Sequence, residues 1–132
     1  MTSPLVRIDG ISKRFGSAVA LEDLSLDIAE GDFVTFLGPS GCGKSTTLRI
    51  LGGFERPDTG RIVLDGEDVT NQPPEKRHVN MVFQDYALFP HMTVQQNIAF
   101  ALELKGLDRS AIKRRLDDIM SFLELDGFGN RY

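Results

Sequence analysis

Apolar and polar residues alternate along the first part of the chain, which is the pattern of half-buried β-strands. The alternation predicts one strand over residues 5–11 and a second over residues 19–28. A short, mostly apolar run bounded by glycines follows at residues 33–37, and it predicts a strand buried on both faces, as in a parallel sheet. A similar run at residues 79–83 predicts another apolar strand. Residues 61–64, followed by the turn pair Asp65 and Gly66, predict a short strand that enters a tight turn.

Helical patterns occur once in the middle of the chain and twice near its end. Residues 44–54 predict a helix stopped by two glycines, and residues 94–105 predict a second, capped by Thr93 and ended by Gly106. A third helix is expected to be capped by Asp108 or Ser110. Its apolar stripe consists of Ile112, Leu116, Ile119, Met120 and Leu123. The pattern is therefore α/β in the first two thirds and helical in the last, and we place the division between residues 1–86 and 87–132.

The segment GPSGCGKST at residues 38–46 carries the clearest chemistry, because it fits the P-loop pattern between an expected strand and an expected helix. Its glycines let backbone amides approach phosphate oxygens, and the helix N-terminus adds partial positive charge there. We expect Lys44 to reach the β- and γ-phosphates of ATP and the Ser45 hydroxyl to ligate Mg²⁺. The alternative is a chance match in a glycine-rich turn. The candidate nucleotide-binding residues are Gly38, Pro39, Ser40, Gly41, Cys42, Gly43, Lys44, Ser45 and Thr46.

Two aspartates follow apolar runs in a way that resembles the metal-binding Walker B strand, which ends in an aspartate. Asp65 closes RIVLD, but it runs directly into a turn pair, so a hairpin is the favoured interpretation. Asp85 closes MVFQD, a run that Gln84 interrupts. Without a metal aspartate, the chain would carry a phosphate cradle and an incomplete hydrolytic site.

Composition narrows the class of protein. The chain has 132 residues, a net charge of -4 and 41% hydrophobic residues, as expected for one ordinary domain without general affinity for nucleic acid. Cys42 is the one cysteine, which excludes an internal disulfide and favours a reducing compartment. No stretch reaches the roughly 18 apolar residues of a membrane-spanning helix, so we expect any membrane role to pass through a partner.

Three segments in this order resemble the ATPase subunits of ABC transporters: KRFGSAVALEDLSLDI, GPSGCGKSTTLRILGGFERPDTGRIVLDG and VFQDYALFPHMTVQQNIAFAL. Within that family, the likeness is strongest to bacterial importers of the spermidine/putrescine, ferric iron, phosphonate and maltose group. The resemblance implies an ABC-type P-loop NTPase fold, with an antiparallel β subdomain and the start of a helical subdomain.

The resemblance also implies roles for single residues. Phe15 matches the aromatic residue that stacks on adenine, although it could be plain packing. Gln84 matches the glutamine that touches Mg²⁺ and the attacking water. The resemblance therefore implies that Gln84 and Ser45 are metal ligands and that Gln84 and Lys44 are catalytic residues. Gln84 could also be an ordinary polar residue at a strand end. The segment around residues 84–92 matches the groove where a membrane-spanning permease subunit docks. Its apolar cluster could instead be core; the members are Phe83, Tyr86, Leu88, Phe89 and Met92.

Further partners implied by the resemblance are a second ATPase subunit, as in a homodimer, and indirectly a solute-binding protein. The location implied is peripheral, on the cytoplasmic side of the inner membrane. The family's signature sequence, Walker B aspartate, catalytic glutamate and switch histidine are not found in these residues, and the resemblance places them after Tyr132.

We therefore expect a truncated ATPase subunit of an importer of small solutes, inactive alone. A non-catalytic nucleotide-binding fragment is the first alternative. Another P-loop enzyme, such as a small-molecule kinase or a GTPase, is the second, although no NKxD-like guanine-reading segment is present.

Overall fold

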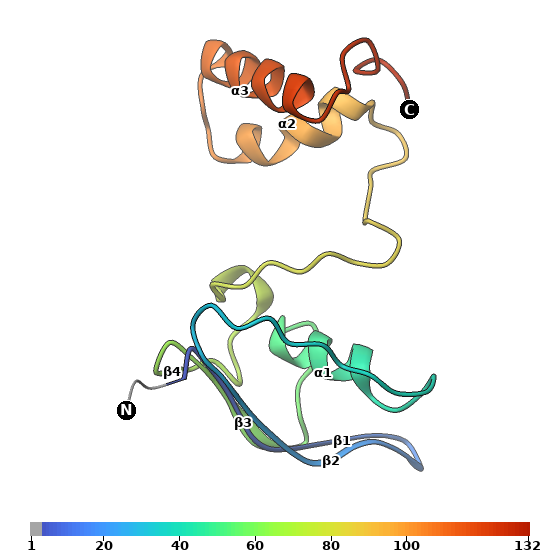
Figure 1. Ribbon diagram of the computed structural model, residues 1–132, viewed down its shortest axis with the longest axis vertical. Helices are drawn as coiled ribbons and strands as arrows, with labels where there is room; N and C mark the ends of the chain where they lie inside the picture. Colours follow the sequence, from blue (N-terminus) through green and yellow to red (C-terminus); the bar gives the residue numbers. More distant parts are fainter. Residues whose placement is uncertain (1–3) are drawn as a thin grey trace. The chain divides into compact units, whose positions relative to one another are not determined.

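The computed structural model describes residues 4–132, and the chain divides into two compact units, Met1–Met81 and Val82–Tyr132. The first unit holds a four-stranded antiparallel sheet and the helix α1, and the second holds the helices α2 and α3 (Figure 1). The functional division expected between residues 86 and 87 remains a prediction.

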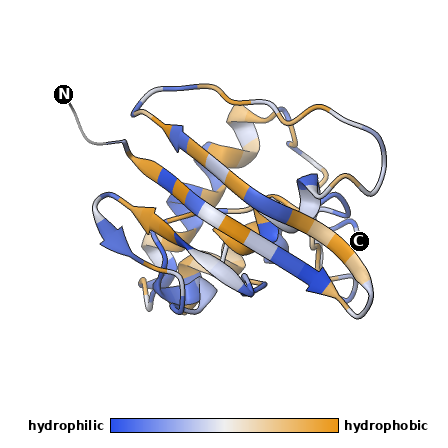
Figure 2. Cartoon of the chain, turned by 90° about the horizontal axis from the view of Figure 1, so that it is seen from below, coloured by the Kyte–Doolittle hydropathy of each residue, from blue (hydrophilic) through white to orange (hydrophobic). Residues whose placement is uncertain are grey.

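The sheet has the strand order β2-β1-β3-β4. Strands β1 (Val6–Phe15) and β2 (Ala18–Ile28) form a long hairpin, and β1 also pairs with β3 (Thr59–Leu64), which turns into the short β4 (Glu67–Asp68). Hydrophobic and hydrophilic residues alternate along the two long strands (Figure 2). The expected half-buried strands are confirmed, and β1 extends further along the chain than the alternation predicts.

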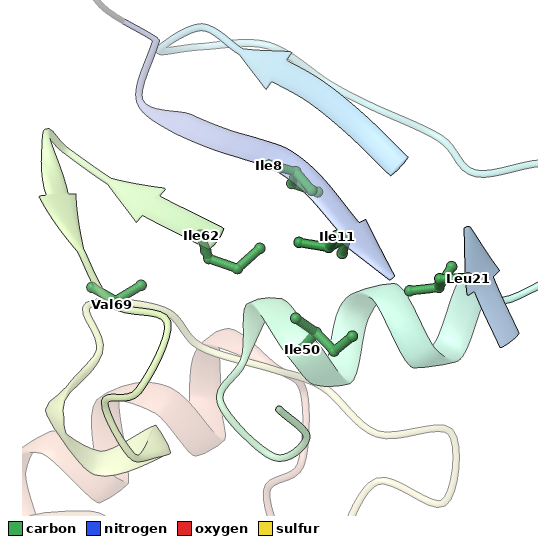
Figure 3. Close-up of a cluster of buried hydrophobic side chains, with 6 residues drawn as sticks. All are labelled: Ile8, Ile11, Leu21, Ile50, Ile62 and Val69. Atoms are coloured by element: carbon green, nitrogen blue, oxygen red, sulfur yellow. The ribbon is translucent and has the colours of Figure 1, made fainter. Parts of the chain in front are cut away.

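One face of this sheet is covered by α1 (Lys44–Leu51), which buries Ile50 completely. Burial of such a side chain contributes roughly 1.5–3 kcal/mol, so α1 is firmly held on the sheet. Figure 3 shows the side chains that meet there: Ile8, Ile11, Leu21, Ile50, Ile62 and Val69.

Two predicted strands are wrong. Residues 33–37 form no strand, and the side chains of Phe33 and Leu37 are 95% and 89% exposed. Residues 79–83 are likewise irregular, and Val82 is 84% exposed. An inner strand is stable only when neighbouring strands pair its amides and carbonyls and other elements cover its faces. No strand among residues 4–132 pairs with either segment, so their apolar character is not matched by burial.

The helices begin where the sequence predicts, and their ends follow from local hydrogen bonds. Helix α1 ends at Leu51, earlier than expected, because Gly53 turns into the left-handed region with a φ of 79° and the Phe54 amide donates back to the Arg49 carbonyl. A short 3-10 helix, η1 (Pro74–Lys76), follows Pro73.

Both helices of the second unit carry side-chain caps. Helix α2 (Val94–Leu104) is capped by Thr93. The Thr93 hydroxyl accepts from the Gln96 amide, and the Gln96 side chain accepts from the Thr93 amide, as in a capping box. Helix α3 (Arg109–Phe122) is capped by Asp108 rather than Ser110, because the Asp108 carboxylate accepts from the amides of Ser110 and Ala111. None of the described helices has the length and apolar character needed to cross a bilayer.

Candidate nucleotide-binding site

The position of the loop at residues 38–43 is set by its contact with the sheet. Gly43 caps α1 in the left-handed region, with φ 92° and ψ 0°. A Cβ at this residue would lie 2.5 Å from the carbonyl oxygen of Ala20 and 2.6 Å from Cδ2 of Leu21, both on β2. Only glycine allows this approach, so the loop rests directly on the β1–β2 hairpin.

The ammonium group of Lys44 is folded over the loop that precedes it. Its Nζ donates to the carbonyl oxygens of Gly38 at 2.7 Å and Pro39 at 2.8 Å, and it lies 3.4 Å from Sγ of Cys42. The Cys42 amide donates to the Pro39 carbonyl at 3.3 Å, which closes the loop into a tight curve. The loop therefore carries a positive charge close to the N-terminus of α1, where the helix dipole is also positive.

Unpaired backbone amides add to this positive end. The amide of Thr47 is bonded to the Gly43 carbonyl at 2.9 Å, whereas the amides of Lys44, Ser45 and Thr46 begin the helix and have no intrahelical acceptor. Ser45 is exposed, so its hydroxyl is accessible from outside the loop. Amides, an ammonium group and a hydroxyl at one helix start are the donor set that a chain of phosphates requires, and the residues present fit such a group.

Phe15 lies on the same hairpin as the loop. It is the last residue of β1, it is 50% exposed, and it pairs with Ala18 on β2. Ala18 precedes Ala20, the residue in contact with Gly43, by two positions, which is roughly 7 Å along a strand. The structure thus places Phe15 near the loop, in the first unit.

Gln84 belongs to the second unit, so its role beside the loop stays a prediction. It is exposed and begins a turn in which the Tyr86 amide donates to the Phe83 carbonyl at 3.0 Å. Asp65 has a φ of 47° in the turn between β3 and β4, which confirms the hairpin interpretation. Among residues 4–132, no group of three or more histidine, cysteine or acidic side chains is placed to hold a metal ion.

The apolar cluster after Gln84 is partly packed and partly exposed. The centroid of the Phe89 ring lies 4.6 Å from that of the Phe100 ring. The Asn97 side chain donates to the Phe89 carbonyl at 3.2 Å and accepts from the Phe89 amide at 2.9 Å. Tyr86 and Leu88 are 73% and 65% exposed. Packing therefore accounts for only part of the cluster.

The family model described as ABC transporter matches residues 21–132. The chain belongs to the ABC transporter family. It is 50% identical over 128 residues to the spermidine/putrescine import ATP-binding protein PotA of Nitrosospira multiformis, covering 97% of this chain and 35% of that protein. It is 51% identical over 127 residues to the sulfate/thiosulfate import ATP-binding protein CysA of Thermosynechococcus vestitus, and the match covers 96% of this chain and 38% of that protein.

Solved ABC structures confirm the fold. One is a dimeric post-hydrolysis state of the ATP-binding cassette MJ0796 bound to ADP and Pi, with a TM-score of 0.78 at 29% identity, covering 96% of this chain and 60% of that one. MJ1267, an ATP-binding cassette of an ABC transporter, matches with the same TM-score and identity, and the match covers 98% of this chain and 58% of that one. The chain thus spans about 35% of the length of its import relatives and somewhat over half of these cassettes. The ABC family binds nucleotide and hydrolyses ATP, and its import subunits dimerise and work with membrane permeases.

Sequence reasoning missed Arg77, a buried residue of this ABC-family chain. Its guanidinium donates to four backbone carbonyls, those of Ile50 at 2.7 Å, Leu51 at 2.9 Å, Gln72 at 2.9 Å and Thr70 at 3.2 Å. Burial lowers the pKa of Arg77 below its ordinary value. Two of the acceptors, the carbonyls of Ile50 and Leu51, are the last two of α1, and the Ile50 carbonyl also accepts from the Gly53 amide at 3.1 Å. Arg77 stands between Lys76 and His78, and nothing in this polar run indicates burial.

Lys13 was missed as well. Its ammonium forms an ion pair with Glu55 at 2.8 Å and another with Asp58 at 3.3 Å, and it donates to the Arg56 carbonyl at 2.8 Å. The bond to Glu55 is the chief cause that raises the pKa of Lys13, and the same bond lowers the pKa of Glu55. The one sequence signal that could have drawn attention to Lys13 is its position two residues before Phe15.

Proposed function

We propose that this chain is the nucleotide-binding part of the ATP-binding subunit of an ABC importer, which couples ATP binding and hydrolysis to the uptake of a small solute. The observation that carries the proposal is the Lys44 ammonium group, held over the loop at 2.7 and 2.8 Å from two of its carbonyls beside the first amides of α1. Relatives of nearly equal identity are named for polyamine and for sulfate import, which are substrates of opposite charge. The similarity therefore supports import and leaves the solute open.

In this proposal ATP and Mg²⁺ are the cofactors. The loop and the first turn of α1 hold the phosphates, and Lys44 compensates their negative charge. Ser45 and Gln84 ligate Mg²⁺, and Phe15 stacks on adenine. Bound ATP supplies the phosphoanhydride bond that is hydrolysed.

The partners are a second ATP-binding subunit, a membrane-spanning permease and, through the permease, a solute-binding protein. Exposed apolar side chains such as Tyr86 and Leu88 support docking of the permease on residues 84–92, since apolar groups in a surface segment favour association. Such a subunit lies on the cytoplasmic side of the inner membrane, attached through the permease.

A second candidate is a nucleotide-binding module without catalysis. It is favoured by the placement of the phosphate-binding loop and Phe15 in one unit, Met1–Met81, because binding without hydrolysis requires no more than contacts to the phosphates and the base. Phosphate release from Mg-ATP separates the two: steady turnover by the purified chain favours the enzyme, and stoichiometric binding without turnover favours the module.

The proposal is tested by titrating Lys44→Ala with fluorescently labelled Mg-ATP. Loss of charge-assisted hydrogen bonds worth about 1.5–3 kcal/mol should weaken binding roughly 10- to 100-fold. Lys113→Ala, which removes an exposed lysine on α3, is the matched control and should bind as the parent chain does. Undiminished binding by Lys44→Ala would contradict the proposal.

A further inference from the structure

Lys13 joins the end of β1 to the turn that follows α1. Only 12% of its side chain is exposed, and its ammonium group is surrounded by acceptors from residues 55–58. The same turn is also bonded to backbone groups of β1: the Asp58 amide donates to the Ser12 carbonyl at 2.8 Å, and the Asp58 carboxylate accepts from the Arg14 amide at 2.7 Å. We call this arrangement of Lys13, Glu55, Arg56 and Asp58 the Lys13 clamp.

The clamp also reaches the ring of Phe15. The Lys13 Nζ lies over this ring at 5.3 Å from its centroid, within the range of a cation–π contact. Because the ammonium group occupies one face while half of the Phe15 surface remains exposed, the ring is held and still accessible. A fixed aromatic ring is the geometry that a planar base needs, since little motion is lost when the base stacks on it.

We propose that Lys13 is a positioning residue for the nucleotide base: it holds the Phe15 ring and ties it, through the turn at residues 55–58, to the helix that begins at the phosphate-binding loop. This inference rests on the proposed function, since it takes ATP as the ligand and Phe15 as its base contact. The base side and the phosphate side of the site then share one frame, because the turn begins a few residues after α1 ends at Leu51.

The charges of the clamp are stable at neutral pH. Hydrogen bonding to Glu55 raises the pKa of Lys13, and the Arg14 amide together with Lys13 lowers the pKa of Asp58. The lysine is therefore cationic and its partners anionic throughout the range in which nucleotide binding is measured.

The test compares Mg-ATP with Mg-tripolyphosphate, which carries the phosphates without a base, by calorimetric titration of the whole chain. Lys13→Met should weaken Mg-ATP binding roughly three- to tenfold and leave Mg-tripolyphosphate binding unchanged. Lys13→Arg, which keeps a cation, should restore most of the ATP affinity. Phe15→Leu should show the same selective loss, and the double variant should lose little more than either single one, because both act on one contact.

Other outcomes overturn the inference in distinguishable ways. If Lys13→Met weakens the binding of both ligands equally, Lys13 has a merely structural role. If it weakens the binding of neither, Lys13 has no role in nucleotide binding. If Lys13→Met melts too low to be titrated, Glu55→Gln takes its place: it removes the shortest ion pair and should selectively weaken ATP by a smaller factor. If the parent chain binds neither ligand, the proposed function is overturned and this inference with it. If the parent chain binds both ligands and every variant keeps the same ratio of Mg-ATP to Mg-tripolyphosphate affinity, the inference alone is overturned.

Discussion

Gly43 is the residue at which the loop, α1 and the sheet meet, and a methyl group there tests the contact directly. In Gly43→Ala, the left-handed backbone adds roughly 1–2 kcal/mol of strain, and overlap with the Ala20 carbonyl and Leu21 adds about 1–3 kcal/mol. We therefore expect the free energy of unfolding, measured in urea without nucleotide, to fall by roughly 2–5 kcal/mol.

Gly41 is the matched control for this substitution. Its φ of 84° is close to that of Gly43, but a Cβ built there meets nothing within 4 Å, so Gly41→Ala should show only the strain. Equal losses in the two variants would mean that the contact with β2 is unimportant. The sequence alone predicted glycines for phosphate approach, but it could not show this contact, because Ala20 is distant along the chain and becomes a neighbour only in the folded sheet.

At the scale of elements, Arg77 fastens the C-terminal end of α1 to the segment at residues 70–77. Arg77→Met removes four hydrogen bonds from a charged, buried donor, so the free energy of unfolding measured in urea should fall by roughly 3 kcal/mol or more. The neighbouring exposed residue supplies the control, and Lys76→Met should change stability by less than about 0.5 kcal/mol. Similar losses in both variants would argue against Arg77 as an anchor.

Local signals predicted the elements that depend on local causes. Alternation located β1 and β2, Thr93 marked the start of α2 by capping, and the Asp65-Gly66 pair marked a hairpin. For α3 the sequence offered two caps, Asp108 and Ser110, of which the structure uses Asp108. The predicted strands at residues 33–37 and 79–83 failed because a strand of that kind depends on neighbouring strands, and hydrophobicity does not supply them. Lys13 and Arg77 were missed for a related reason. The partners of Lys13 and two of the four partners of Arg77 lie tens of residues away, and all of them are carboxylates or backbone carbonyls that no pattern marks.

At the scale of the whole chain, apolar surface is large relative to the buried core. The first unit buries six apolar side chains in one cluster, whereas Phe33, Leu37 and Val82 are almost fully exposed. A small core supplies little stability, and exposed apolar segments favour aggregation. We therefore expect a broad thermal transition at low temperature for the free chain.

Mg-ATP should raise that transition, because a ligand that binds only the folded state stabilises it by about 2.7 kcal/mol at 100 times its dissociation constant. Thermal melts followed by circular dichroism, with and without Mg-ATP, measure the shift, and Lys44→Ala should abolish most of it. A sharp transition at high temperature in the free chain would contradict the expectation of marginal stability.

The Lys13 clamp and Arg77 differ in the kind of group that they bind. The Lys13 clamp binds opposite charges, and the Asp58 side chain is 46% exposed, so dissolved ions can screen it. Arg77 binds neutral carbonyls and is buried, so ions have little access to it. Raising ionic strength should therefore loosen the frame around Phe15 in the nucleotide-free chain while α1 stays fastened to its neighbours.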